Sequence, residues 1–306
     1  MNNIDFLDVL GYSLDKVEEI SNNLNSNYLS YPIRKSNGKL RWIDAPTDEL
    51  KKLQTNILRR FLYKFSAHEA AVGFVSGIGV KDGAERHLQN NVILCLDISN
   101  FFGDIKTDKI YTLIHHLLMA ASRKGWITFN QIDFARARNL LVELVSYKGR
   151  LPQGAPTSPA LANLFSIKID RKLQEIADDN DLVYTRYADD LTFSCIDKTF
   201  NIGSLIPSIE KVLTDLHFKV NTKKTRVMRP HKRMVVTGIV INDKLGIPKY
   251  KWRNFRAKLH NLIRDNVVIT TKEYQQLIGY AEWIRNLNNE RGTFFLTQIG
   301  KIKLQT

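Results

Sequence analysis

The stretch RYADDLTFS, residues 186–194, constrains this chain most, because it sets two adjacent carboxylates inside a run of strand-forming residues. Adjacent aspartates repel each other and favour turns over strands. Asp189 and Asp190 are therefore expected at the turn of a hairpin. A second apolar run, NVILCLDI at residues 91–98, predicts a buried strand that ends near Asp97. An isolated carboxylate is costly there, so we expect the three carboxylates to meet at neighbouring strand ends.

Three carboxylates brought together call for a compensating cation. Hard oxygen ligands suit Mg²⁺, which also keeps waters and binds substrate phosphates. Two such ions about 4 Å apart can activate an attacking 3′-oxygen and stabilise a leaving pyrophosphate. The alternative is a solvated acidic turn, because a Tyr-x-Asp-Asp pattern also arises by chance.

The positive charge of the chain is concentrated in one segment. The formal net charge is +14 and the pI is about 9.6, which favours a polyanionic partner over a protein that is merely basic. Residues 219–264 hold 14 Lys or Arg against Asp243 alone, with Trp252 and Phe255 interleaved, whereas residues 1–30 are net acidic. This concentration favours a surface that follows a phosphate backbone.

Hydrophobic periodicity and turn residues outline an α+β chain. Helices are predicted at 3–26, at 47–66 with Thr47 as N-cap, at 107–146 with a break near Gly125, at 156–177, at 205–216 and beyond Pro248. Strands are predicted at 29–46 as a hairpin around Ser36-Asn37-Gly38, at 91–98, at 182–195, at 218–228 and at 234–242.

Neither cysteine chemistry nor a membrane is indicated. Cys95 and Cys195 sit in apolar strand-like runs and are expected as buried core residues, not as a disulfide or metal pair. No run of about 18 apolar residues is present, so no membrane span is expected. The first residues show no signal-peptide pattern, so we expect a cytoplasmic protein.

Four motifs in order give the chain a specific family resemblance. Tyr187-Ala188-Asp189-Asp190 resembles the YxDD motif of reverse transcriptases, and LDISNFF at residues 96–102 resembles their first catalytic aspartate motif. LPQG followed by APTSPALANL, residues 151–164, resembles their LPQG motif and the helix after it. Asn-Thr-Lys-Lys-Thr at residues 221–225 resembles the lysine motif. The resemblance covers roughly residues 30–242.

Within that family, the chain most resembles the retron enzymes of bacteria. Its length is similar, and Val236-Thr237-Gly238 matches their VTG motif. Their NAxxH motif is partly present as Gly83-Ala84-Glu85-Arg86-His87, with Gly83 where Asn is expected. The departure at Gly83 leaves open a group II intron-like or abortive-infection reverse transcriptase. An idle RNA-binding scaffold that kept the fold is the alternative from another class.

The resemblance implies a right-hand polymerase fold with fingers, palm and thumb. The palm would be an antiparallel sheet backed by helices. The implied boundaries are fingers at 1–90 with part of 124–152, palm at 91–123 and 153–242, and a basic helical thumb at 243–306.

The resemblance also implies roles in catalysis. Asp97 and Asp189 would bind two Mg²⁺ ions, Asp190 would complete the acidic cluster, and the Ile98 carbonyl would add a ligand. Lys224 would donate a proton to pyrophosphate.

Further residues would bind the incoming nucleotide. Phe102 falls at the position of the steric gate that excludes ribonucleotides, whereas Phe101 is expected in the core. Gln153 would lie over the base or sugar. Arg41 would clamp the triphosphate, with Lys39 and Lys35 beside it, although solubilising charges on an exposed hairpin are the alternative.

Nucleic-acid contacts are expected from the YxDD motif, the partial NAxxH motif and the basic C-terminal helix. A stripe of Trp252, Phe255, Leu259 and Leu262 is expected to pack as core, leaving the cations to face a duplex. The expected contacts are Tyr187, His87, Lys251, Arg256, Lys258 and Arg264. For His87, local ordering of the chain is the alternative.

The partners implied are deoxynucleotides, a cognate structured non-coding RNA and the RNA–DNA hybrid made from it. Retron enzymes prime from a 2′-hydroxyl of their own RNA and make a branched RNA–DNA product, msDNA. An effector protein and a role in defence against phage are implied with them.

Overall fold

The computed structural model describes residues 4–34 and 38–304. Lys35 and the turn predicted at Ser36-Asn37 lie outside the described residues. The two free cysteines, Cys95 and Cys195, are buried as expected.

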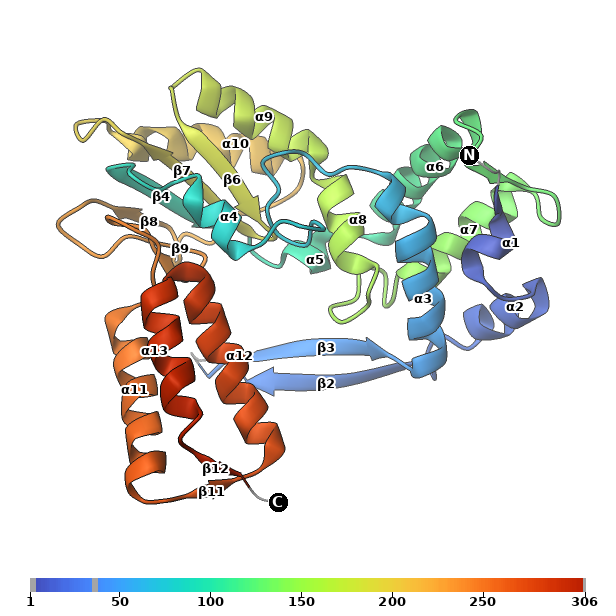
Figure 1. Ribbon diagram of the computed structural model, residues 1–306. Helices are drawn as coiled ribbons and strands as arrows, with labels where there is room; N and C mark the ends of the chain where they lie inside the picture. Colours follow the sequence, from blue (N-terminus) through green and yellow to red (C-terminus); the bar gives the residue numbers. More distant parts are fainter. Residues whose placement is uncertain (1–3, 35–37, 305–306) are drawn as a thin grey trace.

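A four-stranded antiparallel sheet carries the carboxylates. Its strands lie in the order β6 (Val183–Tyr187), β7 (Asp190–Cys195), β4 (Val92–Asp97) and β8 (Arg226–Met228). All six residues of β4 are buried, as the continuous apolar run predicts. Helices α9 (Ile167–Asp178) and α10 (Ile206–Asp215) lie on one face of this sheet (Figure 1). The antiparallel sheet backed by helices is therefore confirmed.

A helical region continues the same hydrophobic core beyond the sheet. Its helices are α1 (Phe6–Leu10), α2 (Leu14–Asn22), α3 (Asp48–Arg60), α6 (Thr107–Arg123), α7 (Phe134–Val145) and α8 (Ser158–Phe165). The shorter elements are β1 (Ile4–Asp5), η1 (Leu62–Lys64), α4 (Val80–Glu85), α5 (Phe101–Asp104), β5 (Ile127–Thr128) and η2 (Ile202–Leu205). The break expected near Gly125 is present, where the glycine has a φ of 65°. The single helix expected over 156–177 divides at Ser166, which caps both α8 and α9.

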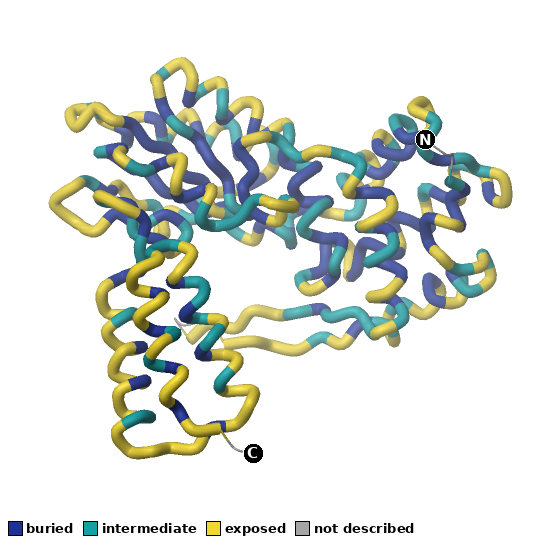
Figure 2. The backbone as a smooth tube through the Cα atoms, in the orientation of Figure 1, coloured by how far each residue is buried: buried dark blue, intermediate teal, exposed yellow. Residues whose placement is uncertain are grey.

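A long hairpin extends from this region below the sheet (Figure 1). It pairs β2 (Tyr28–Arg34) with β3 (Leu40–Pro46), as the sequence predicts. Its distal half is exposed (Figure 2), and its base is held where the Asp44 N–H donates to the Gln153 carbonyl over 2.8 Å. The hairpin is therefore attached to the loop that contains the LPQG motif.

The C-terminal helices form a unit with its own core. This unit contains α11 (Lys249–Arg264), α12 (Thr271–Leu287) and α13 (Asn289–Ile299), with β11 (Val268–Ile269) paired to β12 (Lys303–Leu304). Its buried cluster includes Phe255, Leu259 and Phe295, while most of its surface is exposed (Figure 2). The β9–β10 hairpin (Val235–Val236 and Ile239–Val240) lies between the unit and the sheet, and Trp283 packs against its cluster.

Candidate active site

Strand pairing brings the three carboxylates to one edge of the sheet. The register of β4 with β7 sets Asp97 opposite Asp190. The Ile98 N–H donates to the Asp189 carbonyl over 2.8 Å, so the end of β4 is joined to the β6–β7 turn. The hairpin turn consists of Ala188 and Asp189, and Asp190 already belongs to β7. The expectation that the carboxylates meet at neighbouring strand ends is confirmed.

Two side chains from the lysine motif hold Asp97. The Lys224 ammonium lies 2.5 Å from Oδ2 of Asp97, and the Asn221 amide donates to Oδ1 over 3.0 Å. The Asn221 N–H also donates to the Asp97 carbonyl over 2.7 Å. Asp97 is 5% exposed, so these partners compensate a carboxylate that has lost most of its water. The sequence analysis assigned a role to Lys224 but missed Asn221, although it stands in the same motif.

The cluster changes the proton affinity of its members. Burial, followed by repulsion from Asp189 and Asp97, raises the pKa of Asp190 to about 6. Burial and the charge of Asp97 also raise the pKa of Asp189, whereas the charges of Lys224 and Arg41 oppose the rise. The hydrogen bond to Asp97 raises the pKa of Lys224, so its ammonium is stabilised. The site therefore holds more negative charge than its own cations neutralise.

The donor set fits a hard divalent cation, because it offers carboxylate oxygens and a backbone carbonyl at one sheet edge. Among residues 4–34 and 38–304, no three or more His, Cys, Asp or Glu side chains are already gathered as ligands of one ion. The Asp97 carboxylate is instead hydrogen-bonded to the Lys224 ammonium. An ion at Asp97 would therefore compete with Lys224 for this carboxylate.

The candidate nucleotide residues Arg41, Lys39 and Gln153 lie on the β2–β3 hairpin and on the loop that contacts its base. Arg41 is exposed on β3, and its charge acts on the Asp189 carboxylate. Lys39 is exposed just before β3. Gln153 is partly buried beside the hairpin base, and Gly154 lies so close that a Cβ there would be 2.8 Å from the Asp44 carbonyl oxygen. Only glycine permits this approach at its φ of 136°.

The two phenylalanines after β4 differ in burial, as expected. Phe101 is 3% exposed and its ring centroid lies 5.7 Å from that of Phe218, in the core. Phe102 is half-buried on α5, with its ring centroid 5.5 Å from that of Phe101. Phe102 therefore keeps a free surface, but its role as a gate stays a prediction.

The expectation that His87 contacts nucleic acid is wrong. His87 has no exposed surface, and its ring nitrogens lie 2.6 Å from Ser194 Oγ and 2.7 Å from Thr185 Oγ1. Burial and the charge of Arg86 lower its pKa to about 3, so the ring is neutral. His87 instead orders the chain beneath the sheet, which is the alternative that the sequence left open.

The C-terminal cations are exposed and lie on a separate unit from the carboxylates. Lys251, Arg256, Lys258 and Arg264 all lie on α11. A groove of about 590 Å³ runs between α11 and α13, lined by four basic residues and by the half-exposed ring of Phe294. Those four basic residues are Arg253, Arg256, His260 and Arg264. Arg264 also pairs with Asp265 over 2.8 Å.

Comparison with known proteins identifies the family. The family model described as "Reverse transcriptase (RNA-dependent DNA polymerase)" matches residues 33–241. The retron Ec86 reverse transcriptase of Escherichia coli is 30% identical, over 99% of this chain and 90% of its own length. The chain belongs to the retron-type reverse transcriptases. A second relative, the retron Mx65 reverse transcriptase of Myxococcus xanthus, is 32% identical over 87% of this chain and 62% of its own length.

This retron-type reverse transcriptase is an RNA-directed DNA polymerase, so its template is RNA. Reverse transcriptases as a family use divalent metal ions. This membership favours a retron enzyme over the group II intron-like or abortive-infection reverse transcriptase, and the polymerase activity disfavours the idle RNA-binding scaffold.

The fold agrees with this membership. The telomerase of Candida albicans, solved with an RNA fragment, aligns over 93% of this chain and 59% of its own chain, with a TM-score of 0.51 and 13% identity. The right-hand polymerase fold expected from the sequence is confirmed. No helix among the described residues combines the length and the apolar character that a membrane span requires.

Proposed function

We propose that this reverse transcriptase copies a structured non-coding RNA into a branched RNA–DNA product, using two Mg²⁺ ions at Asp97, Asp189 and Asp190. The observation that carries the catalytic centre is the β4–β7 register, which sets Asp97 opposite Asp190 and beside the turn of Asp189. When bound, the ions would activate the attacking hydroxyl and stabilise the charge on the leaving pyrophosphate.

The chain's own residues have distinct tasks in this proposal. The three carboxylates and the Ile98 carbonyl hold the ions, and Asn221 orients Asp97 through its 3.0 Å hydrogen bond. Lys224 neutralises Asp97 until metal binds, and its Nζ then donates a proton to the leaving pyrophosphate.

The nucleotide is a deoxynucleoside triphosphate. Arg41 and Lys39 on the exposed hairpin bind its phosphates, which favours in-line displacement at the carboxylates. Gln153 lies over its base or sugar. The free surface of Phe102 meets the C2′ position and excludes ribonucleotides.

We divide the chain into the fingers, palm and thumb of the right-hand polymerase fold. We assign residues 1–90 with part of 124–152 to the fingers, 91–123 and 153–242 to the palm, and 243–306 to the thumb. The thumb binds the RNA–DNA hybrid and the structured RNA through the exposed cations of α11. An RNA–DNA hybrid is recognised by shape and backbone, which suits a basic helix. Tyr187 of the YxDD motif is a further nucleic-acid contact in this proposal. From the resemblance of its motifs to retron enzymes, we further propose that this enzyme acts in the cytoplasm with an effector protein, in defence against phage.

The test is extension of a DNA primer on an RNA template with Mg²⁺, for wild type, Asp189→Asn and Asp179→Asn. Asp179 is an exposed aspartate at the end of α9 and serves as a matched control. We expect Asp189→Asn to lose synthesis by at least about 10³-fold while its binding of RNA is retained, because only transition-state stabilisation is removed. Synthesis at the wild-type rate in Asp189→Asn would show that the carboxylate assignment is wrong.

The branched product needs its own assay. On the RNA encoded beside its gene, the enzyme should make DNA joined to RNA through a 2′,5′ linkage. A product with only 3′,5′ linkages would contradict the branched product without affecting the catalytic assignment.

A further inference from the structure

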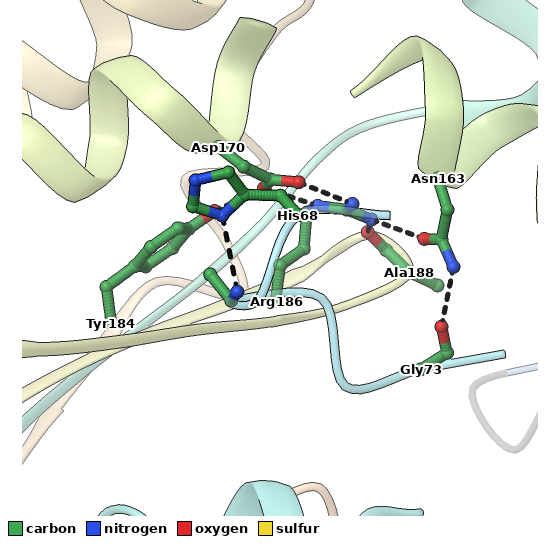
Figure 3. Close-up of polar contacts among 8 residues, drawn as sticks. His68, Gly73, Asn163, Asp170, Tyr184, Arg186 and Ala188 are labelled. Carbon is green, nitrogen blue, oxygen red and sulfur yellow. Dashed lines mark hydrogen bonds and ion pairs between the residues drawn. The ribbon is translucent and has the colours of Figure 1, made fainter. Parts of the chain in front are cut away.

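A fully buried ion pair lies next to the β6–β7 turn of Ala188 and Asp189, which we call the catalytic turn. Arg186 precedes Tyr187 in β6, and neither Arg186 nor its partner Asp170 on α9 has any exposed surface. Two hydrogen bonds of 2.7 Å join them, from Nε to Oδ1 and from Nη2 to Oδ2 (Figure 3). The Tyr184 hydroxyl also donates to Asp170, over 2.9 Å.

Stability does not explain this arrangement. Removing two charges from water is costly, and a well-packed apolar pair of similar volume is often as stable or more stable. An arginine does offer five N–H donors in a rigid planar fork, so it can fix several acceptors at once. Besides Asp170, the Arg186 guanidinium has two further acceptors. These acceptors indicate which parts of the molecule it holds in place.

The first of these acceptors belongs to the catalytic turn. Nη1 of Arg186 donates to the Ala188 carbonyl over 3.2 Å. Ala188 has a φ of 54°, a left-handed conformation that side-chain-bearing residues rarely adopt without support. That carbonyl belongs to the peptide linking Ala188 to Asp189. Holding it therefore determines the direction in which Asp189 leaves the turn.

The second acceptor, Asn163, connects Arg186 to a neighbouring loop, residues 70–74, which we call the Phe74 loop. Nη1 of Arg186 also donates to Oδ1 of Asn163 over 3.0 Å, and the Asn163 amide donates to the Gly73 carbonyl over 2.8 Å (Figure 3). The same loop pairs with the outer edge of β6, because the Arg186 N–H donates to the Ala70 carbonyl over 2.7 Å and the Arg186 carbonyl accepts from the Val72 N–H over 2.9 Å. One guanidinium thus connects the loop to the turn.

The loop lies directly on the turn. A Cβ at Gly73 would be 3.0 Å from Cγ of Tyr187 and 3.1 Å from the Ala188 nitrogen. The next residue, Phe74, has a φ of 59° and is 49% exposed, and its ring centroid lies 5.8 Å from that of Tyr187. A bulky side chain held in a left-handed conformation marks a position that its surroundings determine.

We propose that Arg186, Asp170 and Asn163 are positioning residues of the polymerase, which lock the Asp189 turn and the Phe74 loop into one rigid unit. Asp170 orients the guanidinium, Arg186 holds the turn, and Asn163 carries the connection to Gly73. The proposal rests on the proposed catalytic role of Asp189. Its consequence is that these residues determine the rate of nucleotide addition and the metal requirement, whereas the thumb determines hybrid binding.

Asn163→Ala tests the proposal without exposing a buried charge, because Arg186 keeps Asp170 and the Ala188 carbonyl. Asn90→Ala is the matched control, since Asn90 is also a buried asparagine and its amide donates to Ser194 elsewhere on the same sheet. We expect both variants to lower the urea midpoint of unfolding to a similar extent. Only Asn163→Ala should lower kcat, by about tenfold to a hundredfold, because a misplaced reacting group costs about that much.

Arg186→Lys is the second variant. A lysine keeps the charge opposite Asp170 but cannot hold the carboxylate, the turn and Asn163 in one plane. We expect it to lower kcat at least as much as Asn163→Ala and to raise the Mg²⁺ concentration for half-maximal synthesis. The dissociation constant for the RNA–DNA hybrid should stay within about twofold of the wild-type value, because the thumb is unchanged.

The outcomes separate this inference from the proposed function. If Asp189→Asn is inactive but folded Asn163→Ala and Arg186→Lys keep the wild-type kcat and Mg²⁺ midpoint, the ion pair is structural only and the inference is wrong. If Asp189→Asn is active, the proposed catalytic centre is wrong, and the network then has no catalytic group to position.

Discussion

The palm and the thumb use arginine in opposite ways. In the palm, Arg186 has no exposed surface, and its hydrogen bonds all go to protein acceptors. In the thumb, α11 carries exposed cations over a small core of its own. A buried arginine can hold only what the fold places beside it, whereas exposed arginines act on whatever polyanion approaches. We infer from this comparison that the buried Arg186 serves geometry, whereas the exposed arginines of α11 serve attraction.

The largest effect that we expect from a change in one of these two regions is on nucleotide selection by the palm. Phe102→Val should raise the use of ribonucleotides relative to deoxynucleotides by about a hundredfold, because a smaller side chain leaves room for a 2′-hydroxyl. The measurement is the ratio of kcat/KM for the two nucleotides on one RNA template.

Phe294→Val is the thumb control for that experiment, because it makes the same change at a phenylalanine whose ring is accessible, although more exposed than that of Phe102. It should leave nucleotide selection unchanged. Equal selection by wild type and Phe102→Val would show that Phe102 is not a steric gate. It would also weaken the contrast between palm and thumb.

A smaller effect is expected from a thumb charge. Arg256→Gln should weaken hybrid binding severalfold and reduce the slope of log K against log salt by about one, because one phosphate contact is lost. The kcat at saturating hybrid should not change. Titrations at several salt concentrations measure this, with the exposed Arg123→Gln of α6 as a control of equal charge change. If Arg256→Gln lowered kcat and Arg123→Gln did not, the thumb would contribute to catalysis and not only to hybrid binding.

The smallest effect concerns pH and stability in the palm. The raised pKa of Asp190, about 6 in the folded protein, means that the folded state binds more protons than the unfolded state between about pH 4 and pH 6. This group's contribution to stability therefore falls as the pH rises through that window. Without divalent metal, Asp190→Asn should be more stable than wild type at pH 7 and lose this advantage near pH 4.

The expected gain is on the order of 1 kcal/mol or less, because Asp190, although partly desolvated by the protein around it, keeps an exposed surface where water screens the repulsion. Urea unfolding at the two pH values measures it. Added Mg²⁺ should stabilise wild type more than the variant, because the variant lacks one of the proposed ligands of the ion. A variant that is less stable than wild type at pH 7 without metal would show that the carboxylates do not repel each other.

Local patterns were sufficient for much of the palm. The apolar run before Asp97 and the two aspartates of the hairpin predicted strands that meet at one edge, and the pairing of β4 with β7 confirms this. Such features follow from residues that are neighbours in the chain, since burial, alternation and turn preference are read over a few positions.

Partners that are distant in the chain could not be predicted in this way. His87 is a plausible RNA contact in its motif, yet it is buried against Ser194 and Thr185, more than ninety residues away. No spacing rule connects Arg186 in a strand with Asp170 on a helix. Only the packing of that helix on the sheet decided that the two would meet.

Motifs and periodicity are local, so the sequence alone was enough to predict the α+β class and the family, and to nominate the site residues. The tertiary structure decided which charges are buried, which loop lies on the catalytic turn, and that Lys224 and Asn221 hold Asp97. The physical reason is that desolvation and hydrogen-bond geometry depend on all the atoms around a group, and most of those atoms come from distant parts of the chain.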